Sequence, residues 1–532
     1  DGLSVGAQAL IRLSGKAAND GSGQMAAQLS ANQIDLKAGS TLRLDDSTLL
    51  SGTQTATQGA ARIKLDAGQL LELGGEVKAV AQATLASVSI ESGSQVLLSG
   101  QVEAGAVTVL AGTDAAGDGA IVADQETVIT ALTGNLILKA GHYGGDIRLD
   151  QTTLNASGAA QTVELTAASG GIHQTQLAKS GAGMAITGRV DAGHLRVLAE
   201  TGITLQTRTP TIDLLQLTGA GQIDLVNLSD LTVQRAQAYD GAIRLRNYGA
   251  LTVTEAVTLG SNDANDIVLT TYRVGVAAAD LSVGSLSNSG RGDIELHAAG
   301  VLRQIDGTQL LANQLSVFAE SQDAMASIEL VNLKINVDSL TLATASAGSV
   351  QLTQGTRDLD VGDVELANGS LDIEASGSVQ LGDIRLSNLE GSKLYLKAQQ
   401  DILLAGRISA GIYLSDLAAT PLSANGELAT QLSSAGDIEL ISSAGRIVQA
   451  VGKQDVSLVA DLLTLDAAQG IAGLQVAINR LDAVTQAGDL SLSERDGLLE
   501  AMAQAEEGEA AEAERMQIEA EKLDEISETE RT

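Results

Sequence analysis

Residues 436–440 read Gly-Asp-Ile-Glu-Leu, and this short phrase indicates how the chain folds. The apolar side chains of Ile438 and Leu440 alternate with polar ones, which is the period-two pattern of a half-buried strand, and the glycine marks the turn before it. The phrase returns, unchanged or as a near variant, at residues 145–149, 265–269, 292–296, 362–366, 382–386, 400–404 and 488–492. Each copy is therefore predicted to open a strand.

The spacing of these copies and of looser variants indicates a repeat array. Many successive copies are separated by 20 to 29 residues, and further short alternating segments lie between them. Two or three short strands per interval make one coil of a parallel β-helix, in which each coil buries its apolar row only by stacking on its neighbours. A series of β-sandwich domains is the alternative, but it requires linkers, and the sequence contains no recognisable linker.

We therefore predict an all-β protein, a right-handed parallel β-helix (a solenoid) over residues 1–497. Ile294, Ile384 and Ile438 are expected inside it, with each Gly-Asp pair at a corner. The composition agrees, because one Phe, six Tyr and no Trp among 532 residues suit a narrow core of small and branched side chains. Two prolines in the whole chain suit a backbone that is hydrogen-bonded almost throughout.

The last segment, residues 498–532, differs in composition. Residues 500–532 hold twelve acidic and three basic residues and only one glycine, and good helix formers dominate. Met516, Leu523 and Ile526 fall near helical spacing, but the apolar stripe is thin. We predict a short acidic C-terminal tail, either α-helical or disordered, and leave open whether it is solvated or caps the last coil.

Charge and cysteine content exclude several classes of partner and site. The net charge of −34 should repel phosphate backbones and anionic lipid headgroups, so we expect no nucleic acid partner. The chain has no cysteine, which excludes disulfides and thiolate metal sites. It contains no run of about 18 apolar residues, so no transmembrane helix is expected.

Catalytic and metal-binding motifs are scarce. The four histidines, His142, His173, His194 and His297, are scattered and form no known metal or nucleophile motif. Four aspartates of the repeat could converge on an outer face, but Asp at a strand onset most simply hydrogen-bonds the turn backbone; they are Asp146, Asp150, Asp363 and Asp383. Two aspartate pairs in polar segments could bind calcium: Asp114 with Asp118, and Asp263 with Asp266. No calcium-binding repeat or EF-hand loop surrounds them, so we interpret both segments as ordinary turns. We expect no catalysis, no cofactor and no metal.

The tripeptide Arg291-Gly292-Asp293 is the one candidate binding motif, because integrins read this tripeptide in adhesive proteins. Gly292 and Asp293 already belong to the recurring phrase, so only Arg291 is additional. A tripeptide held at a strand onset is also not displayed on an open loop. We keep it as a weak candidate for receptor binding.

The chain repeats an order of elements: a Gly-Asp-Ile strand, an Ala-Gly turn and a Leu-x-Leu strand, most densely over residues 436–494. This order resembles the β-helical shaft of filamentous haemagglutinin-like exoproteins of Gram-negative bacteria. Those are large adhesins exported by two-partner secretion. The resemblance implies an extracellular or outer-surface location and attachment to host or neighbouring cells, or to copies of itself. The family's Asn-Pro-Asn-Leu type secretion motif is absent from this sequence, so the resemblance implies an internal or C-terminal portion.

The sequence thus leaves two classes of function in view. The first is a structural or adhesive shaft of a large secreted surface protein, which mediates cell-surface, biofilm or host attachment. The alternative is a β-helical enzyme that acts on polysaccharides as a lyase or hydrolase. An enzyme needs one groove with clustered carboxylates and long inserted loops, whereas a shaft can be uniform. The sequence has few long insertions, which favours the shaft.

Overall fold

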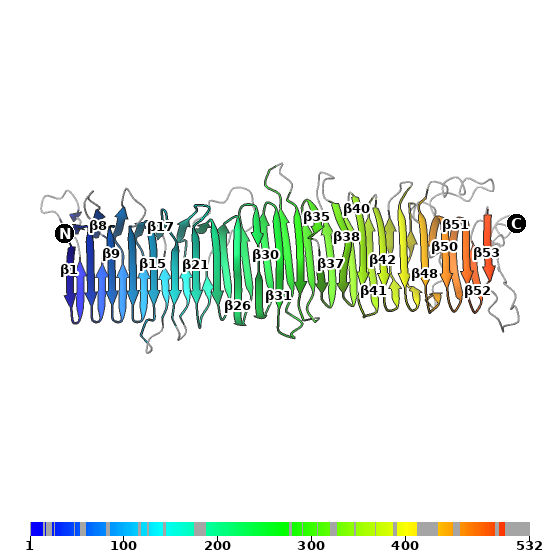
Figure 1. Ribbon diagram of the computed structural model, residues 1–532, viewed down its shortest axis with the longest axis horizontal. Helices are drawn as coiled ribbons and strands as arrows, with labels where there is room; N and C mark the ends of the chain where they lie inside the picture. Colours follow the sequence, from blue (N-terminus) through cyan, green and yellow to red (C-terminus); the bar gives the residue numbers. More distant parts are fainter. Residues whose placement is uncertain are drawn as a thin grey trace, which may run out of the picture. The chain divides into compact units, whose positions relative to one another are not determined.

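The computed structural model consists of short parallel strands stacked coil upon coil. It describes residues 2–13, 16–17, 24–25, 27–46, 48–53, 60–80, 86–114, 119–124, 127–141, 145–174, 188–275, 279–289, 291–305, 307–319, 327–344, 347–367, 369–386, 391–411, 435–450, 458–494 and 500–505. Over these residues the chain is all-β and contains no helix. It divides into two compact units, Asp1–Ala277 and Ala278–Thr532, and Figure 1 follows the strands of each.

Three ladders of parallel strands make up unit 1. The first contains β1 (Gly2–Ala7), β6 (Gln33–Ala38), β9 (Arg62–Ala67), β12 (Ser87–Ser92), β15 (Ala106–Ala111), β18 (Leu136–Ala140), β21 (Thr162–Ala167), β24 (His194–Ala199), β26 (Thr211–Ala220), β28 (Leu231–Val233), β29 (Ala236–Asp240) and β31 (Leu251–Thr258). The second contains β2 (Leu10–Leu13), β7 (Thr41–Leu44), β10 (Leu70–Leu73), β13 (Gln95–Leu98), β16 (Ile121–Ala123), β19 (Ile147–Leu149), β22 (Ile172–His173), β25 (Ile203–Arg208), β27 (Ile223–Asn227), β30 (Ile243–Tyr248) and β32 (Ile267–Tyr272). The third contains β5 (Ala27–Ala31), β8 (Thr48–Thr53), β11 (Glu76–Val80), β14 (Gln101–Ala104), β17 (Val128–Ala131), β20 (Thr153–Ala156) and β23 (Arg189–Ala192), and a separate antiparallel pair joins β3 (Lys16–Ala17) to β4 (Gln24–Met25).

Unit 2 also consists of ladders of parallel strands. One ladder contains β33 (Leu281–Ser287), β35 (Val301–Gln304), β36 (Gln309–Leu311), β38 (Ser327–Asn336), β40 (Ala347–Gln354), β42 (Gly369–Ala375), β45 (Lys393–Ala398), β48 (Asp437–Ser442) and β50 (Leu458–Ala467). Another contains β34 (Ile294–Ala298), β37 (Gln314–Ala319), β39 (Ser339–Thr344) and β41 (Leu359–Leu366), which continues through β43 (Val379–Leu381), β46 (Ile402–Leu404) and β49 (Ile447–Gln449), and through β44 (Ile384–Leu386) and β47 (Ile408–Ser409). The long strand β51 (Ile471–Thr485) pairs with β50, β52 (Leu490–Glu494) and β53 (Glu500–Ala505).

The core of each unit is built from apolar residues in matching register. Along the second ladder of unit 1, one inward position forms a fully buried column: Leu42, Leu71, Val96, Ile121, Ile147, Ile172, Ile203, Ile223, Ile243 and Ile267. Burying each such side chain contributes roughly 1.5–3 kcal/mol. Ile294, Ile384 and Ile438 in unit 2 have no exposed surface, as predicted from the sequence. The prediction of a parallel β-helix is thereby confirmed.

Glycine at the corners allows close approach of consecutive coils. At Gly241, whose φ is +138°, an added Cβ would lie 1.5 Å from the carbonyl oxygen of Gly221 one coil away. No side chain fits there, so substitution would push two coils apart.

The end of the array lies later than the sequence indicated. Strand β53 pairs in parallel with the second half of β51, so the ladder extends past residue 497 to Ala505. The composition changes there, but the backbone still pairs, because strand pairing needs peptide groups in register more than a particular side-chain composition. Residues 506–532 lie outside the described residues, and the acidic tail stays a prediction for them.

Candidate functional site

Among the described residues, one hydrogen bond to an aspartate side chain recurs at corners of the coils, and in three of its seven copies the aspartate follows a glycine. The Oδ1 atom of Asp146 accepts the backbone N–H of Gly171 on the next coil at 3.0 Å. The same acceptor role recurs in Asp230 to Ala250 at 2.9 Å, Asp280 to Val301 at 2.9 Å, Asp293 to Gln314 at 3.1 Å, Asp358 to Ser378 at 2.7 Å, Asp383 to Arg407 at 2.8 Å and Asp401 to Arg446 at 2.8 Å. The interpretation of these aspartates as partners of the turn backbone is confirmed for Asp146 and Asp383. We call this contact the corner bond.

Asp150 and Asp363 do not follow this pattern. Asp363 lies inside β41 at a bulge, where Gly362 and Asp363 together oppose Thr341 of β39, and its side chain is exposed. Asp150 follows β19 and is half-buried. The four aspartates are divided between the units, with Asp146 and Asp150 in unit 1 and the others in unit 2.

The tripeptide Arg291-Gly292-Asp293 forms the turn before β34. Gly292 is buried, and its carbonyl oxygen accepts the N–H of Asn313 at 2.9 Å. The half-buried Asp293 carboxylate accepts hydrogen bonds from the N–H of Gln314 at 3.1 Å and from the Asn313 amide at 3.2 Å. Arg291 is exposed. The aspartate is thus engaged in the coil, and receptor binding through this tripeptide stays a prediction.

The histidines are in separate local settings. His194 Nδ1 lies 3.1 Å from Asp213 Oδ1, next to the bulge in β26. The His297 ring stacks on Phe318 of the next coil with ring centroids 4.9 Å apart. His173 lies on β22, while His142 lies outside the described residues. No group of three or more potential metal ligands occurs in the part of the chain that the structure describes.

The calcium candidates are tested only in part. Asp118 lies outside the described residues, whereas Asp114 is described and exposed. Asp263 is exposed in the turn between β31 and β32, and Asp266 ends that turn. The segment with Asp263 and Asp266 is a turn between two strands, whereas the residues between Asp114 and Asp118 lie outside the described part of the chain.

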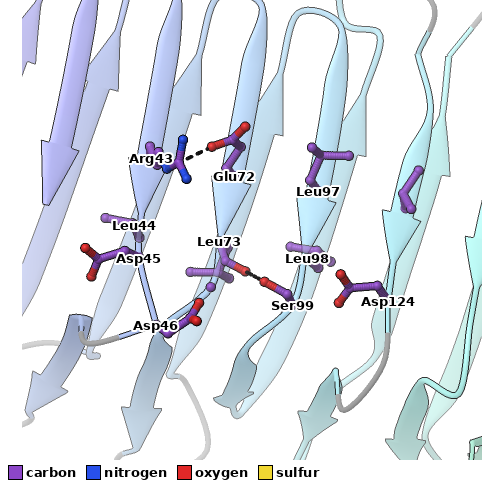
Figure 2. A pocket seen from close by; sticks show the side chains of 12 residues that line it. Arg43, Leu44, Asp45, Asp46, Glu72, Leu73, Leu97, Leu98, Ser99 and Asp124 are labelled. Carbon is purple, nitrogen blue, oxygen red and sulfur yellow. Dashed lines mark hydrogen bonds and ion pairs between the residues drawn. The ribbon is translucent and has the colours of Figure 1, made fainter. Parts of the chain in front are cut away.

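A pocket of about 460 Å³ lies on the surface of unit 1, along the ends of β7, β10 and β13 (Figure 2). Acidic side chains dominate its polar lining: Asp45, Asp46, Glu72 and Asp124. Glu72 is neutralised by Arg43, whose Nε lies 3.1 Å from Glu72 Oε2. The Asp46 carboxylate occupies the space beside Gly74, where a Cβ would lie 2.2 Å from Asp46 Oδ1. Glycine at 74 therefore leaves room for this carboxylate.

The electrostatics of this pocket single out Asp124. Partial burial raises its pKa, the hydrogen bond from its own N–H opposes this, and the negative charges of Asp46 and Asp150 raise it further. The net pKa of Asp124 is above its ordinary value. A carboxyl group that holds its proton more tightly can act as a general acid, but catalysis also requires a partner placed across a substrate. We nominate no such partner among the described residues.

No pattern in the sequence predicted this pocket. Asp45 and Asp46 follow β7 and Asp124 follows β16, three coils further along the ladder, in segments that share no phrase with the repeat. They line one pocket only because successive coils place their corners one above the other. Asp46 and Asp124 are far apart in the sequence, so the sequence alone does not indicate that they line the same pocket. Predicting the pocket would require the exact number of residues in each coil. The spacing of the repeated phrase varies too much to give that number.

Comparisons with known proteins add no identity. No protein-family model, no curated protein and no solved structure matches the chain. Among the described residues there is also no helix of the length and hydropathy needed to cross a membrane.

Proposed function

We propose that this chain is a shaft segment of a large bacterial surface protein, extracellular and structural or adhesive, similar to the shafts of filamentous haemagglutinin-like exoproteins. The observation that carries the proposal is the corner bond, which recurs at corners in both units with distances of 2.7–3.1 Å. Such repetition produces a similar surface on many coils. It suits a protein that holds a binding element away from a cell or attaches along its length.

The charge on the lateral surface supports the same proposal. Opposite charges on consecutive coils pair across the ladder, for example Lys37 with Asp66 at 3.3 Å and Lys64 with Glu91 at 3.0 Å. These pairs leave a large excess of negative charge over the whole chain. A strongly negative surface keeps long parallel ladders from associating side by side. Partners would therefore bind at specific sites on the surface and not along all of it. We propose surface molecules of a host or neighbouring cell, or further copies of this chain, as those partners.

Deleting one coil tests the shaft proposal. Val88 and Ile90 of β12 are in register with Val107 and Val109 of β15, so removing residues 91–109 joins Ile90 to Leu110 without changing the inward and outward alternation. The shortened protein should fold and, displayed on its producing cell, should support attachment like the intact protein. Attachment of cells to a host-cell layer or to one another is the measurement, and a strain that lacks the whole chain gives the baseline.

The matched control removes one residue fewer. Deleting residues 91–108 places Val109 directly after Ile90, so two inward residues become neighbours and every later side chain in the strand faces the wrong way. This variant should disrupt the coils next to the junction, unfold at a lower urea concentration than the in-register deletion, and support attachment less well. The proposal is wrong if a strain without the chain attaches normally. It is also wrong if the in-register deletion folds but abolishes attachment.

A polysaccharide-acting enzyme is the second candidate, and the raised pKa of Asp124 in the acidic pocket is the observation that favours it. We expect purified protein to leave polygalacturonate and alginate uncleaved. The measurement is release of unsaturated or reducing ends over hours, with the variant Asp124→Asn as comparison. Turnover that the intact protein shows and Asp124→Asn loses would replace the shaft proposal with an enzyme.

A further inference from the structure

Two of the chain's few aromatic residues are stacked on consecutive coils. Strands β30 and β32 pair in parallel with Tyr248 opposite Tyr272. The two ring centroids are 5.0 Å apart and the ring planes differ by 25°. The register of the strands imposes this contact, because paired strands are separated by about 4.8 Å.

The phenol groups of the pair share one half-buried environment. Partial burial raises the pKa of Tyr248, the nearby Tyr272 raises it further, and the positive charge of Arg246 opposes both effects. The rings, with centroids 5.0 Å apart, therefore share one environment. Arg246 is held in place by Asp224 on the previous coil at 2.6 Å. Both rings keep some exposure to solvent, so a small oxidant or an electron acceptor can reach them.

The other described tyrosines are in different settings. Tyr239 is more accessible than the pair, with 56% of its surface exposed, but no ring contact involves it. Tyr395 lies on β45 beneath the ammonium group of Lys393, which is 5.6 Å from the ring centre. Tyr248 and Tyr272 are thus the only described tyrosines whose rings contact each other.

We propose that Tyr248 and Tyr272 form an oxidative cross-linking site, at which a peroxidase with hydrogen peroxide converts the pair into a dityrosine bridge between β30 and β32. Each phenol gives up one electron and one proton, and one hydrogen peroxide accepts both pairs and becomes two water molecules. The two tyrosyl radicals join through a carbon atom next to each hydroxyl-bearing carbon. Each of these carbons then loses its hydrogen as the ring regains aromaticity and its hydroxyl group. The product has two hydrogens fewer than the starting pair.

Stacking favours this coupling over competing reactions. A tyrosyl radical on a solitary exposed ring must meet a second protein molecule, whereas the pair supplies its partner at a fixed position. Each ring turns about two side-chain bonds, which lets the stacked rings tilt edge to edge for bond formation. The bridge would close one complete coil covalently and slow its unfolding. The proposal goes beyond the shaft function and does not depend on it.

The arrangement of cleavage sites makes the test direct. Trypsin cuts after Arg246 and Arg273 and releases residues 247–273 as one peptide that contains both tyrosines. Purified full-length chain is treated with a haem peroxidase and limiting hydrogen peroxide, then unfolded and digested. We expect this peptide to lose the mass of two hydrogens, and expect cleavage after Glu255 to leave its two parts joined. Dityrosine fluorescence should rise in the monomer fraction at a rate independent of protein concentration.

Three conservative variants complete the experiment. Tyr248→Phe and Tyr272→Phe keep the stacked rings but remove one phenol, so each should lower the yield of the bridged peptide at least tenfold. Tyr239→Phe should leave the yield unchanged. Oxidation of urea-unfolded chain should also give much less bridged peptide than oxidation of folded chain. The proposal is overturned if peptide 247–273 keeps its mass while other cross-links form, or if the unfolded chain couples equally well.

Discussion

At the scale of single residues, the surrounding backbone decides what an aspartate does. Asp383 follows a glycine at a corner and accepts the N–H of Arg407 on the next coil at 2.8 Å. Asp363 occupies the same place in the repeated phrase, yet it lies within a continuous strand at a bulge and is exposed. The same Gly-Asp pair thus forms a hydrogen bond between two coils at one site and a bulge within a strand at the other.

Replacing these two aspartates should therefore have unequal effects. Asp383→Ala removes the acceptor of the corner bond, which lies at the solvent-exposed surface, and should lower the free energy of unfolding by about 0.5–1.5 kcal/mol. Asp363→Ala should change it by less than about 0.5 kcal/mol, because the exposed Asp363 carboxylate is not the acceptor of a corner bond. Urea unfolding followed by circular dichroism measures both. Equal losses would show that the corner bond does not stabilise the coil.

The pH dependence should separate two carboxylates of unit 1. Partial burial raises the pKa of Asp146, but the hydrogen bond from Gly171 and the contact with Arg148 outweigh it and leave the pKa below its ordinary value. Ionised Asp146 therefore adds stability above its ordinary pKa, and this is lost as the pH falls through the lower pKa of the folded state. Asp124 has the opposite shift, so its ionised form costs stability at neutral pH, and that cost disappears in acid.

The corresponding amide variants make this measurable. At pH 7, Asp146→Asn should lower the melting temperature and Asp124→Asn should raise it, each by a few degrees at most, because both carboxyls are near the surface. The Asp124 difference should vanish below the ordinary carboxyl pKa, whereas the Asp146 difference should vanish only once the pH is below the lowered pKa of folded Asp146. Melting curves from pH 3 to pH 7 test the pair. A shift of the same sign in both variants at pH 7 contradicts the assignment.

The sequence predicted the residues that repeat and missed those that meet only in space. The alternation around Ile294 and Ile438 follows from period two, so their burial could be predicted without coordinates. The corner role of Asp383 followed from glycine and turn chemistry. The bulge at Asp363 could not be predicted, because it depends on how β41 matches Thr341 of the preceding strand. The pocket at Asp124 requires the coil length as well.

At the scale of strands, a polar column inside unit 1 connects four consecutive coils. It consists of Thr207, Asn227, Asn247 and Thr271, all buried and in register on β25, β27, β30 and β32. Asn227 accepts hydrogen bonds from the Thr207 hydroxyl and the Thr209 N–H, and its amide donates to Ser229 and Asn247. The repeated pattern Ile-x-Leu-x-Thr or Asn was visible in the sequence. Its meaning was not, because a buried asparagine requires acceptors and donors that only the register supplies.

Within this column, substitution of Asn227 should reduce stability most, because Asn227 makes the most hydrogen bonds. Asn227→Ala leaves the N–H of Thr209 and the Oδ1 of Asn247 without that partner in the interior, and should cost about 2–4 kcal/mol in the free energy of unfolding. Asn247→Ala should cost less, because Asn227 keeps its bond to the Ser229 carbonyl. Chemical denaturation of both variants provides the comparison. A smaller loss for Asn227→Ala than for Asn247→Ala would contradict this order.

At the scale of the whole molecule, stability in each unit comes from contacts between neighbouring coils. Every ladder strand that is paired on both sides buries its inward residues between two others, as Leu71 lies between Leu42 and Val96 in unit 1. In unit 2, β50 and β51 pair over nine residue positions. Energy is thus distributed along each array, and removing chain at one place should affect mainly the adjacent coil.

Truncation near the C-terminal residues tests this local dependence. Strand β53 covers Arg480–Thr485 of β51, so deleting residues 500–532 exposes the backbone groups that this part of β51 uses for pairing. Deleting only residues 506–532 leaves every described strand in place. Both proteins should retain the β-rich far-ultraviolet spectrum, because the buried columns remain. Only the longer deletion should form end-to-end oligomers in sedimentation analysis, because an uncovered strand edge pairs with another chain.

If the shorter deletion already associates, residues 506–532 shield the array. If it unfolds, those residues belong to the folding core, and the acidic tail predicted from the sequence is wrong.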